Sequence, residues 1–392
     1  MKKVLLRAPL LTSSGYGVHS RQVLRWLLSV QDSKRFGEMQ ITTHPLKWGN
    51  TSWMLNETME NGLIGRALSL ANDDRKKHDV SFQIQLPNEW DTSLAHVNIG
   101  LTAAVESDRC IPEWVYAVNR MDAVVVPSEH IAQVLRNSGT ITSRLTVIPE
   151  AFPDEIFSEK KDLTDQFNFD TSFNFLLVGQ FTGNNPYNDR KNLFFTIKWL
   201  CEAFADDKDV GIVLKLNSGR ASKIDREITM AVVSRLVNEV RKSAFPKIHV
   251  VHGALTNDEI VSLYKHPSMK ALVSLTRGEG FGLPTLEAAA CGLPVIATNW
   301  SGHLDFMNMG KFIKIDYDLK PIHKSRVDGQ IFVEGSRWAE PSEIDFKRKA
   351  IKFRTKNDVV FEWAQDLAKK IKESHSQVAI NKHYNSAFGS LL

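Results

Sequence analysis

Residues 277–299 read RGEGFGLPTLEAAACGLPVIATN, and this stretch decides the fold class of the chain. The preceding residues 271–276, ALVSLT, form a short apolar run that is typical of a buried strand. A glycine-rich loop follows and leads into Pro284, which suits the first turn of a helix. We expect that helix to end at Cys291, because Gly292 suits a left-handed cap.

The predicted order of strand, glycine loop and helix start indicates an anion-binding site. N–H groups in the first turn of a helix lack intrahelical acceptors, and the helix dipole makes this end positive. Two carboxylates bracket the loop. Glu279 lies between glycines, where we expect a polar and mobile setting, and Glu287 lies about one turn into the helix. The alternative is a tight turn that binds nothing, with Glu287 as an ordinary exposed glutamate.

The pattern from Glu279 to Glu287, EGFGLPTLE, followed by AAACGLPVI, resembles the Glu-x7-Glu signature of the retaining GT-B glycosyltransferases of family four. The resemblance is close over this stretch, and the rest of the chain is compatible with it. It implies that Glu287 holds the ribose hydroxyls of a nucleotide sugar and that Glu279 contacts the transferred sugar. It also implies donor contacts from the loop amides of Gly280, Phe281, Gly282 and Leu283.

Strand and helix patterns alternate along the whole chain, which favours an α/β fold with parallel sheets. Together with the resemblance, this alternation predicts GT-B architecture, in which two Rossmann-like, doubly wound domains face a central cleft. We expect an N-terminal acceptor domain at 1–165 and a C-terminal donor domain at 166–374. The charged run at 159–162 suits a connection between them. An amphipathic pattern over 359–380 predicts the last helix, and the end of the chain, about 375–392, is expected to cross back to the first domain.

A second glycine loop, Gly15-Tyr-Gly17, follows the first predicted strand. Ligands of doubly wound folds gather at the carboxyl ends of strands, beside helix starts. By resemblance, this loop would approach the donor diphosphate. A plain turn is the alternative, since Gly-x-Gly alone is weak evidence.

Cations near the predicted second domain could stabilise a diphosphate leaving group. Arg190-Lys191 resembles the family's Arg-Lys-Gly motif, whose lysine binds phosphate. Asn192 stands where this motif usually has glycine. Gln180 stands where many relatives have arginine, which leaves a second flanking cation in question. The alternative for the pair is a solvated start of a helix. Lys215 lies inside a strand pattern, needs a partner or an edge there, and is a further donor-binding candidate.

The loop after the strand pattern at 97–101 contains Glu106 and Asp108. Either carboxylate could orient the acceptor or the donor sugar, and exposed loop carboxylates are the alternative. His19 and His303 fit structural roles better than catalytic ones.

Metal chemistry has little support in the sequence. Asp316 and Asp318 spell Asp-x-Asp, a metal signature of a different glycosyltransferase fold, and we interpret them as structural. Histidines and cysteines show no zinc spacing. We therefore expect no metal site and no cofactor beyond the nucleotide-diphosphate sugar, which is the donor substrate.

The composition limits partners and location. A net charge of +4 without a long basic run gives little support to nucleic acid as a partner, and it is compatible with weak contact with an acidic membrane. The three cysteines show no disulfide pattern, and no segment has the length of a membrane span. We expect a cytoplasmic protein, with peripheral contact at the inner membrane face left open.

The predicted function is transfer of a sugar, with retained configuration, from a nucleotide-diphosphate sugar to a hydroxyl acceptor. The acceptor, the base and the sugar of the donor stay open at this stage. Two alternatives remain: a GT-B sugar-nucleotide epimerase, and a non-catalytic protein that binds a sugar nucleotide. A DNA-modifying glycosyltransferase has less support because the net charge is small.

Overall fold

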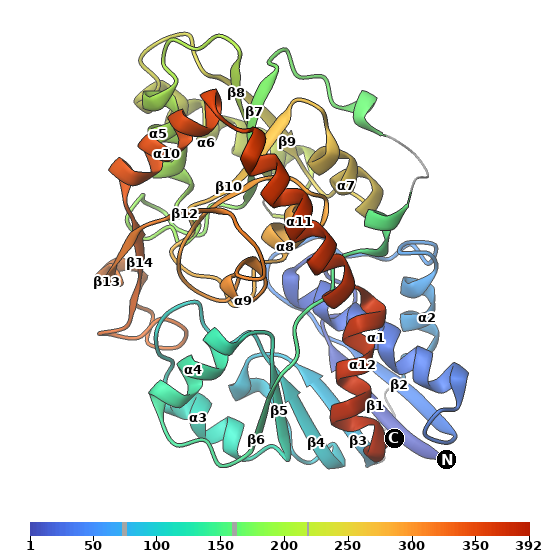
Figure 1. The fold of residues 1–392 in the computed structure, drawn as a ribbon. Coiled ribbons are helices and arrows are strands. Elements are labelled where there is room, and N and C mark those ends of the chain that lie inside the picture. Colours follow the sequence, from blue (N-terminus) through green and yellow to red (C-terminus); the bar gives the residue numbers. More distant parts are fainter. Residues whose placement is uncertain (73–76, 159–162, 218) are drawn as a thin grey trace. The chain divides into compact units, whose positions relative to one another are not determined.

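The computed structural model describes residues 1–72, 77–158, 163–217 and 219–392, which form two compact units (Figure 1). The first unit contains residues 1–151, 329–333 and 374–392. The second contains residues 152–328 and 334–373. The chain thus passes between units after Ala151, while the predicted boundary lies at residue 165. The charged run at 159–162 lies outside the described residues.

The first unit is built on a six-stranded parallel sheet in the order β2-β1-β3-β4-β5-β6. Its strands are β1 (Lys2–Ala8), β2 (Met39–Pro45), β3 (His78–Ile84), β4 (Ala95–Leu101), β5 (Ala123–Val126) and β6 (Arg144–Val147). Consecutive residues are buried in β1, β3, β4 and β5, as expected of strands that are covered on both faces. The order reverses direction beside β1, as in doubly wound folds.

The α-helices described in this unit are α1 (Gly15–Ser33), α2 (Leu63–Ser69), α3 (Pro112–Asn119), α4 (Glu129–Ser138) and α12 (Gln377–Phe388). Helices α1 and α12 pack against each other (Figure 1). The rings of Trp26 and Tyr384 stack at 4.8 Å between centroids, and Trp26 Nε1 donates to Asn385. The end of the chain therefore completes the core of the first unit.

The second unit is built on another six-stranded parallel sheet, in the order β12-β11-β10-β7-β8-β9. Its strands are β7 (Phe173–Gly179), β8 (Val210–Leu216), β9 (Lys247–His252), β10 (Met269–Ser274), β11 (Val295–Thr298) and β12 (Ile313–Ile315). An antiparallel pair follows, β13 (Tyr317–Pro321) with β14 (Arg337–Pro341). The predicted α/β class with parallel sheets is confirmed.

The helices of the second unit are α5 (Leu193–Ala203), α6 (Lys223–Val240), α7 (Asn257–Lys265), α8 (Leu283–Ala290), α9 (Leu304–Met307), α10 (Glu343–Thr355) and α11 (Asp358–Ser374). A capping box starts α7, with Thr256 accepting from the N–H of Glu259. Among the described residues, no helix combines the length and the apolar character that a membrane crossing needs.

The prediction of one amphipathic helix over 359–380 is wrong. Two helices occupy this range, because α11 ends at Ser374 and α12 starts at Gln377. The hydroxyl of Ser376 accepts from the N–H of Ala379 and caps the second helix. An apolar period that continues through a break cannot reveal the break, whereas a serine cap can.

Candidate functional site

The loop between β10 and α8 has the predicted strand, glycine loop and helix order. Gly282 is the N-cap of α8, with φ +101°, a left-handed conformation that favours glycine. Pro284 lies in the first turn. The helix ends as predicted, with Cys291 as the C-cap and Gly292 at φ +76°.

Glu279 is the centre of the candidate site. Its carboxylate pairs with two cations: Lys191 Nζ lies 2.6 Å from Oε1, and Arg190 Nη1 lies 3.4 Å from Oε2. Only 8 % of Glu279 is exposed. The expected mobile setting of this residue is therefore wrong, because two ion pairs and the surrounding protein hold it in place.

The electrostatics of this cluster favour an ionised Glu279. Burial alone would raise the pKa of the carboxyl, but the charges of Lys191 and Arg190 outweigh burial and lower it to about 2. The cluster therefore contains two cations and one carboxylate at neutral pH. It has one positive charge in excess, which favours an anionic ligand.

Long-range contacts fix the segment with the two cations. The buried guanidinium of Arg277 donates to the carbonyl oxygens of Pro186 at 2.9 Å and Asp189 at 2.7 Å. It also binds both carboxylate oxygens of Glu340, each at 2.8 Å. In the backbone, Arg277 N donates to Arg190 O at 2.8 Å. The loop before α5 is thus tied to the end of β10 and to β14.

Asn192 has a backbone conformation that would also suit a glycine. It adopts φ 54°, a left-handed conformation that asparagine tolerates better than most residues. Its side chain donates to Leu275 O at 3.1 Å. Arg190 and Lys191 therefore reach Glu279 without a glycine, and the alternative of a solvated basic pair is wrong. Gln180, by contrast, is exposed.

The loop after β11 supports Glu279 from its backbone. The N–H of Glu279 donates to Ser301 Oγ at 3.0 Å, and Gly302 N donates to Glu279 O at 3.0 Å. Ser301 has φ 88°, a conformation that costs free energy in residues other than glycine and is common at functional sites. Apart from its place beside Gly302, nothing near Ser301 in the sequence indicates this contact with Glu279.

His303 lies beneath the loop and is buried. Its Nε2 lies 2.9 Å from Thr298 O, and burial lowers the pKa of the ring. A Cβ added to Gly282 would lie 3.0 Å from His303 Cβ, so the loop passes close to this side chain. These contacts agree with the structural role predicted for His303.

The start of α8 offers N–H groups to a ligand. Among the residues that the structure describes, the N–H groups of Gly282 and Leu283 have no hydrogen-bond acceptor. Gly280 and Phe281, the other two loop residues of the prediction, are buried beside them. The helix start and the positive cluster at Glu279 therefore both favour an anion at this end of α8.

Glu287 lies on α8 and has a partner that the sequence did not reveal. The hydroxyl of Tyr264, on α7, donates to Glu287 Oε2 at 3.1 Å. Burial raises the pKa of Glu287 to about 7, although the hydrogen bond from Tyr264 works in the opposite direction. The residue is only partly exposed, so the alternative of an ordinary exposed glutamate is wrong. Its charge changes near neutral pH.

Lys215 has the partner that an in-strand lysine needs. Its Nζ donates to Gly253 O at 2.6 Å, beside the end of β9. Burial lowers the pKa of Lys215 to about 8. The structure places Lys215 at the carboxyl edge of the same sheet as the Glu279 cluster, and no contact joins it to Glu279 among the described residues.

The second glycine loop starts α1 in the first unit. A Cβ on Gly17 would lie 2.1 Å from Thr12 O, so the close approach of the backbone requires glycine there. Gly15 is the first residue of the helix, and the hydroxyl of Ser14 caps it by accepting from Gly17 N at 3.0 Å. This geometry accounts for Gly17 as a packing requirement, and a ligand contact stays a prediction.

Tyr16 lies between these glycines, and no local pattern in the sequence indicates its contacts. Its hydroxyl lies 3.1 Å from Thr102 Oγ1 and accepts from Ala103 N at 3.1 Å. The glycine loop therefore contacts the loop after β4, which contains Glu106 and Asp108. Both carboxylates are partly buried.

His19 has a structural environment in the first unit. Its Nε2 lies 3.1 Å from the hydroxyl of Tyr384 on α12, and burial lowers the pKa of the ring to about 4. The imidazole is therefore neutral at physiological pH and packs α1 against α12.

The Asp-x-Asp sequence at 316–318 leads into a β-strand. Asp318 lies on β13 and pairs with Glu340 on β14, as part of a two-stranded ladder. Among the described residues, no three histidine, cysteine, aspartate or glutamate side chains gather in a group that could hold a metal ion.

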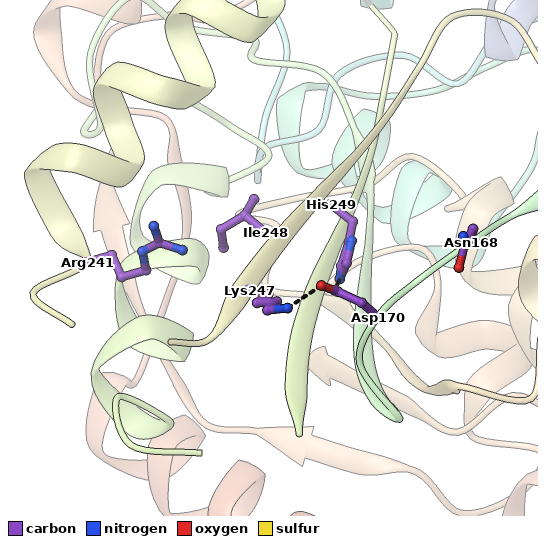
Figure 2. Close-up of a pocket in the computed structure, with 6 residues that line it drawn as sticks. All are labelled: Asn168, Asp170, Arg241, Lys247, Ile248 and His249. Atoms are coloured by element: carbon purple, nitrogen blue, oxygen red, sulfur yellow. Dashed lines mark hydrogen bonds and ion pairs between the residues drawn. The ribbon is translucent and has the colours of Figure 1, made fainter. Parts of the chain in front are cut away.

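A separate hollow of about 350 Å³ lies at the amino edge of the second sheet, where β9 begins (Figure 2). It is lined by Asn168, Asp170, Arg241, Lys247, Ile248 and His249. Asp170 pairs with Lys247 and lies 3.4 Å from His249 Nε2. Parallel strands place this hollow at the edge opposite the Glu279 loop, and it contains none of the predicted site residues.

Two comparisons with known proteins match parts of the chain. Residues 232–323, which include Glu279 and Glu287, match the family model "Glycosyl transferases group 1". A probable sucrose-phosphate synthase of Thermosipho melanesiensis is 28 % identical over 176 residues. That alignment covers 44 % of this chain and 36 % of the relative, so the chain matches little more than a third of that protein's length.

Solved structures match the whole chain at low identity. HepE of Anabaena, solved with UDP and glucose, has a TM-score of 0.62 and 13 % identity, and the match covers 100 % of both chains. The sucrose-phosphate synthase of Thermosynechococcus elongatus has a TM-score of 0.64 and 14 % identity over 100 % of this chain and 99 % of the other. The fold is GT-B. Each of the two units contributes one Rossmann-like sheet to it.

Proposed function

We propose that the protein is a glycosyltransferase that transfers a sugar from a nucleoside diphosphate sugar to a hydroxyl acceptor, with retained anomeric configuration. The GT-B fold and the matched segment at 232–323 support the reaction class. HepE of Anabaena has been solved with UDP-glucose, which makes a uridine diphosphate sugar the first donor to test. Sugar phosphates are the first acceptors to test, since the relatives include sucrose-phosphate synthases.

One observation supports this proposal above the others: a buried carboxylate and two cations lie at the amino end of α8. The net positive cluster of Glu279, Lys191 and Arg190 suits a pyrophosphate, and the N–H groups of Gly282 and Leu283 add further donors. In the proposed roles, the cations and amides bind the phosphates. Glu279 then accepts from hydroxyls of the transferred sugar.

Glu287 is proposed to hold the ribose. An ionised carboxylate accepts hydrogen bonds only, and two neighbouring ribose hydroxyls are donors that match it. Tyr264 fixes one of the carboxylate oxygens from α7. The glycine loop at Gly15–Gly17, and the candidates Lys215, Glu106 and Asp108, stay predictions for donor or acceptor contacts.

The proposed chemistry needs neither a covalent intermediate nor a metal. The bond between the anomeric carbon and the diphosphate oxygen breaks, and the acceptor oxygen bonds to the same face of that carbon. The proton of the acceptor hydroxyl passes to the departing phosphate oxygen. Lys191, Arg190 and the α8 amides stabilise the charge that grows on the diphosphate, which is where fixed electrostatics contribute most to the rate.

The proposal is tested by a thermal-shift screen of nucleotide sugars on the full chain, followed by turnover assays with the donor that binds. A ligand at a hundredfold excess over its dissociation constant stabilises a protein by about 2.7 kcal/mol. We expect one donor to reach this range and Glu287→Ala to lose most of the effect. Release of free nucleoside diphosphate, only when an acceptor is present, supports transfer.

Two results would redirect the proposal. Conversion of the donor to an isomer without release of nucleoside diphosphate would identify an epimerase. Tight donor binding without turnover against any acceptor would identify a binding protein.

A further inference from the structure

Helix α6 has an exposed apolar row along one side. Ile224 is 69 % exposed, Ile228 57 % and Val232 44 %, and the four-residue spacing places them one above another on the helix. The opposite face packs into the core of the second unit. Its buried residues are Thr229, Val233, Leu236, Val237 and Val240. One side of the helix is therefore packed against the core, while no part of the chain that the structure describes covers the apolar row on its outer side.

A row of alternating charges runs alongside the apolar row. Lys223, Glu227, Ala231, Arg235 and Glu239 follow one another at four-residue intervals, and all five are exposed. The signs along the row are positive, negative, neutral, positive and negative. The small neutral residue stands at its centre.

This pattern is complementary to itself when the helix is reversed about Ala231. A second copy in the opposite direction sets Lys223 against Glu239 and Glu227 against Arg235, twice each across the pair. A second copy in the same direction sets each charge against its like, which disfavours that arrangement. Rows at four-residue spacing are also the surfaces that interlock when two helices pack at the most common crossing angle.

We propose that two copies of this chain associate through an antiparallel contact between their α6 helices, on a two-fold axis near Ala231. Such an interface is isologous, because the same patch serves both subunits. Ala231 lets the two backbones approach, Ile224, Ile228 and Val232 supply apolar area, and the flanking charges fix direction. The contact does not depend on the catalytic proposal.

The dimer is weak and depends on concentration. A helix of 18 residues is about 27 Å long, and one helix pair buries less area than the roughly 1,600 Å² of a standard stable interface. Partners dissociate when the apolar area barely offsets the entropy lost on association. We therefore expect a monomer in dilute solution and a dimer as the concentration rises.

Sedimentation velocity of the full chain at rising concentration tests the proposal. Glu227→Arg and Arg235→Glu each set like charges together, and each should weaken dimerisation at least about tenfold, or about 1.4 kcal/mol. The double variant Glu227→Arg/Arg235→Glu restores opposite charges and should return to the dissociation constant of the wild type. Ile228→Asp should abolish the dimer, and the thermal unfolding of each variant shows that it has folded.

Cross-linking tests the geometry independently. Under mild oxidation, Ala231→Cys should form a covalent dimer, while the wild type and Lys369→Cys, at an exposed site on α11, should not. A protein that stays monomeric at all concentrations overturns the proposal. So does a dimer that the charge variants leave unchanged. Binding to acidic phosphatidylserine vesicles that is lost in Ile228→Asp would assign the row to a membrane instead.

Discussion

The ammonium nitrogen of Lys191 lies 2.6 Å from Glu279 Oε1, although 88 residues separate them in the chain. The pair closes the cluster at the start of α8 and neutralises one of its two cations before any ligand arrives. In the function proposed above, a diphosphate that enters would compete with Glu279 for Lys191. Glu279 could then accept from the hydroxyls of the transferred sugar, so this ion pair would link the two parts of the donor.

Glu279→Gln should separate donor binding from turnover. The neutral side chain removes the carboxylate charge that faces Lys191 and Arg190, so nucleoside diphosphate should bind at least as tightly as in the wild type. The proposed sugar contact is weakened, so kcat should fall about a hundredfold. Calorimetry with nucleoside diphosphate and steady-state kinetics measure the two effects. A parallel loss of binding and turnover would contradict the roles assigned to this cluster.

Lys191→Met should weaken nucleoside diphosphate binding about tenfold, or about 1.4 kcal/mol, because one cation is lost from a buried anion site. The matched control is Lys198→Met, which removes an equal charge from a partly exposed position on α5. It should change the dissociation constant little. Equal effects of the two changes would indicate that only the general charge of the protein matters.

Local sequence accounted for the glycine loop and α8, because each of their signals acts within a few residues. A strand run, a helix-starting proline and a glycine cap predicted the elements at 271–292, and all three are present. The alternation of strands and helices likewise predicted the parallel sheets. Local backbone preferences and apolar periods are sufficient for such features.

The hydrogen bonds and ion pairs that hold the site residues in place could not be predicted in the same way, because each joins residues that are distant in the sequence. Tyr264 reaches Glu287 from another helix, and Arg277 binds Glu340 across 63 positions. Nothing in the residues near Glu287 indicates a tyrosine partner or a pKa of about 7. The sequence named the residues of the candidate site, while tertiary packing alone sets their protonation and pairing.

Arg277 should stabilise the site rather than bind a ligand. Arg277→Met leaves the carboxylate of Glu340 and two carbonyl oxygens without their donor, so the free energy of unfolding should fall by about 3 kcal/mol. The double variant Arg277→Met/Glu340→Met should lose much less free energy of unfolding than the two single variants lose together. The coupling energy between the two residues should be about 1–3 kcal/mol. Denaturant unfolding measures all three. Simple additivity would show that the ion pair has no energetic role.

Gly282→Ala tests the geometry at the start of α8. The substitution adds strain at φ +101° and brings a Cβ to 3.0 Å from His303 Cβ, so it should cost about 1–3 kcal/mol and weaken donor binding. Gly37→Ala is the matched control, because Gly37 has φ +116° and no atom near an added Cβ. Thermal unfolding should show the larger loss for Gly282→Ala. Equal losses would show that the contact with His303 is unimportant.

Glu287 should make donor binding depend on pH near neutrality. Its pKa is raised to about 7, and only the ionised carboxylate accepts from both ribose hydroxyls. If binding needs the ionised form, affinity at pH 6 should be about tenfold lower than at pH 8. Calorimetry should use an intact nucleotide sugar, because the terminal phosphate of a nucleoside diphosphate itself titrates near this range.

The free energy of unfolding of the protein without ligand should fall as the pH rises, whereas the affinity for the donor should rise. The folded pKa of Glu287 lies above the usual value of 4.5, so the folded state binds more protons between about pH 4.5 and 7. The stabilisation from this group is complete below the unfolded pKa and is lost as the pH rises through about 7. Glu287→Gln should remove both pH dependences, and Tyr264→Phe should move the binding midpoint upward, because the hydrogen bond from Tyr264 lowers the pKa. Unchanged pH profiles in Glu287→Gln would assign the titration to another group.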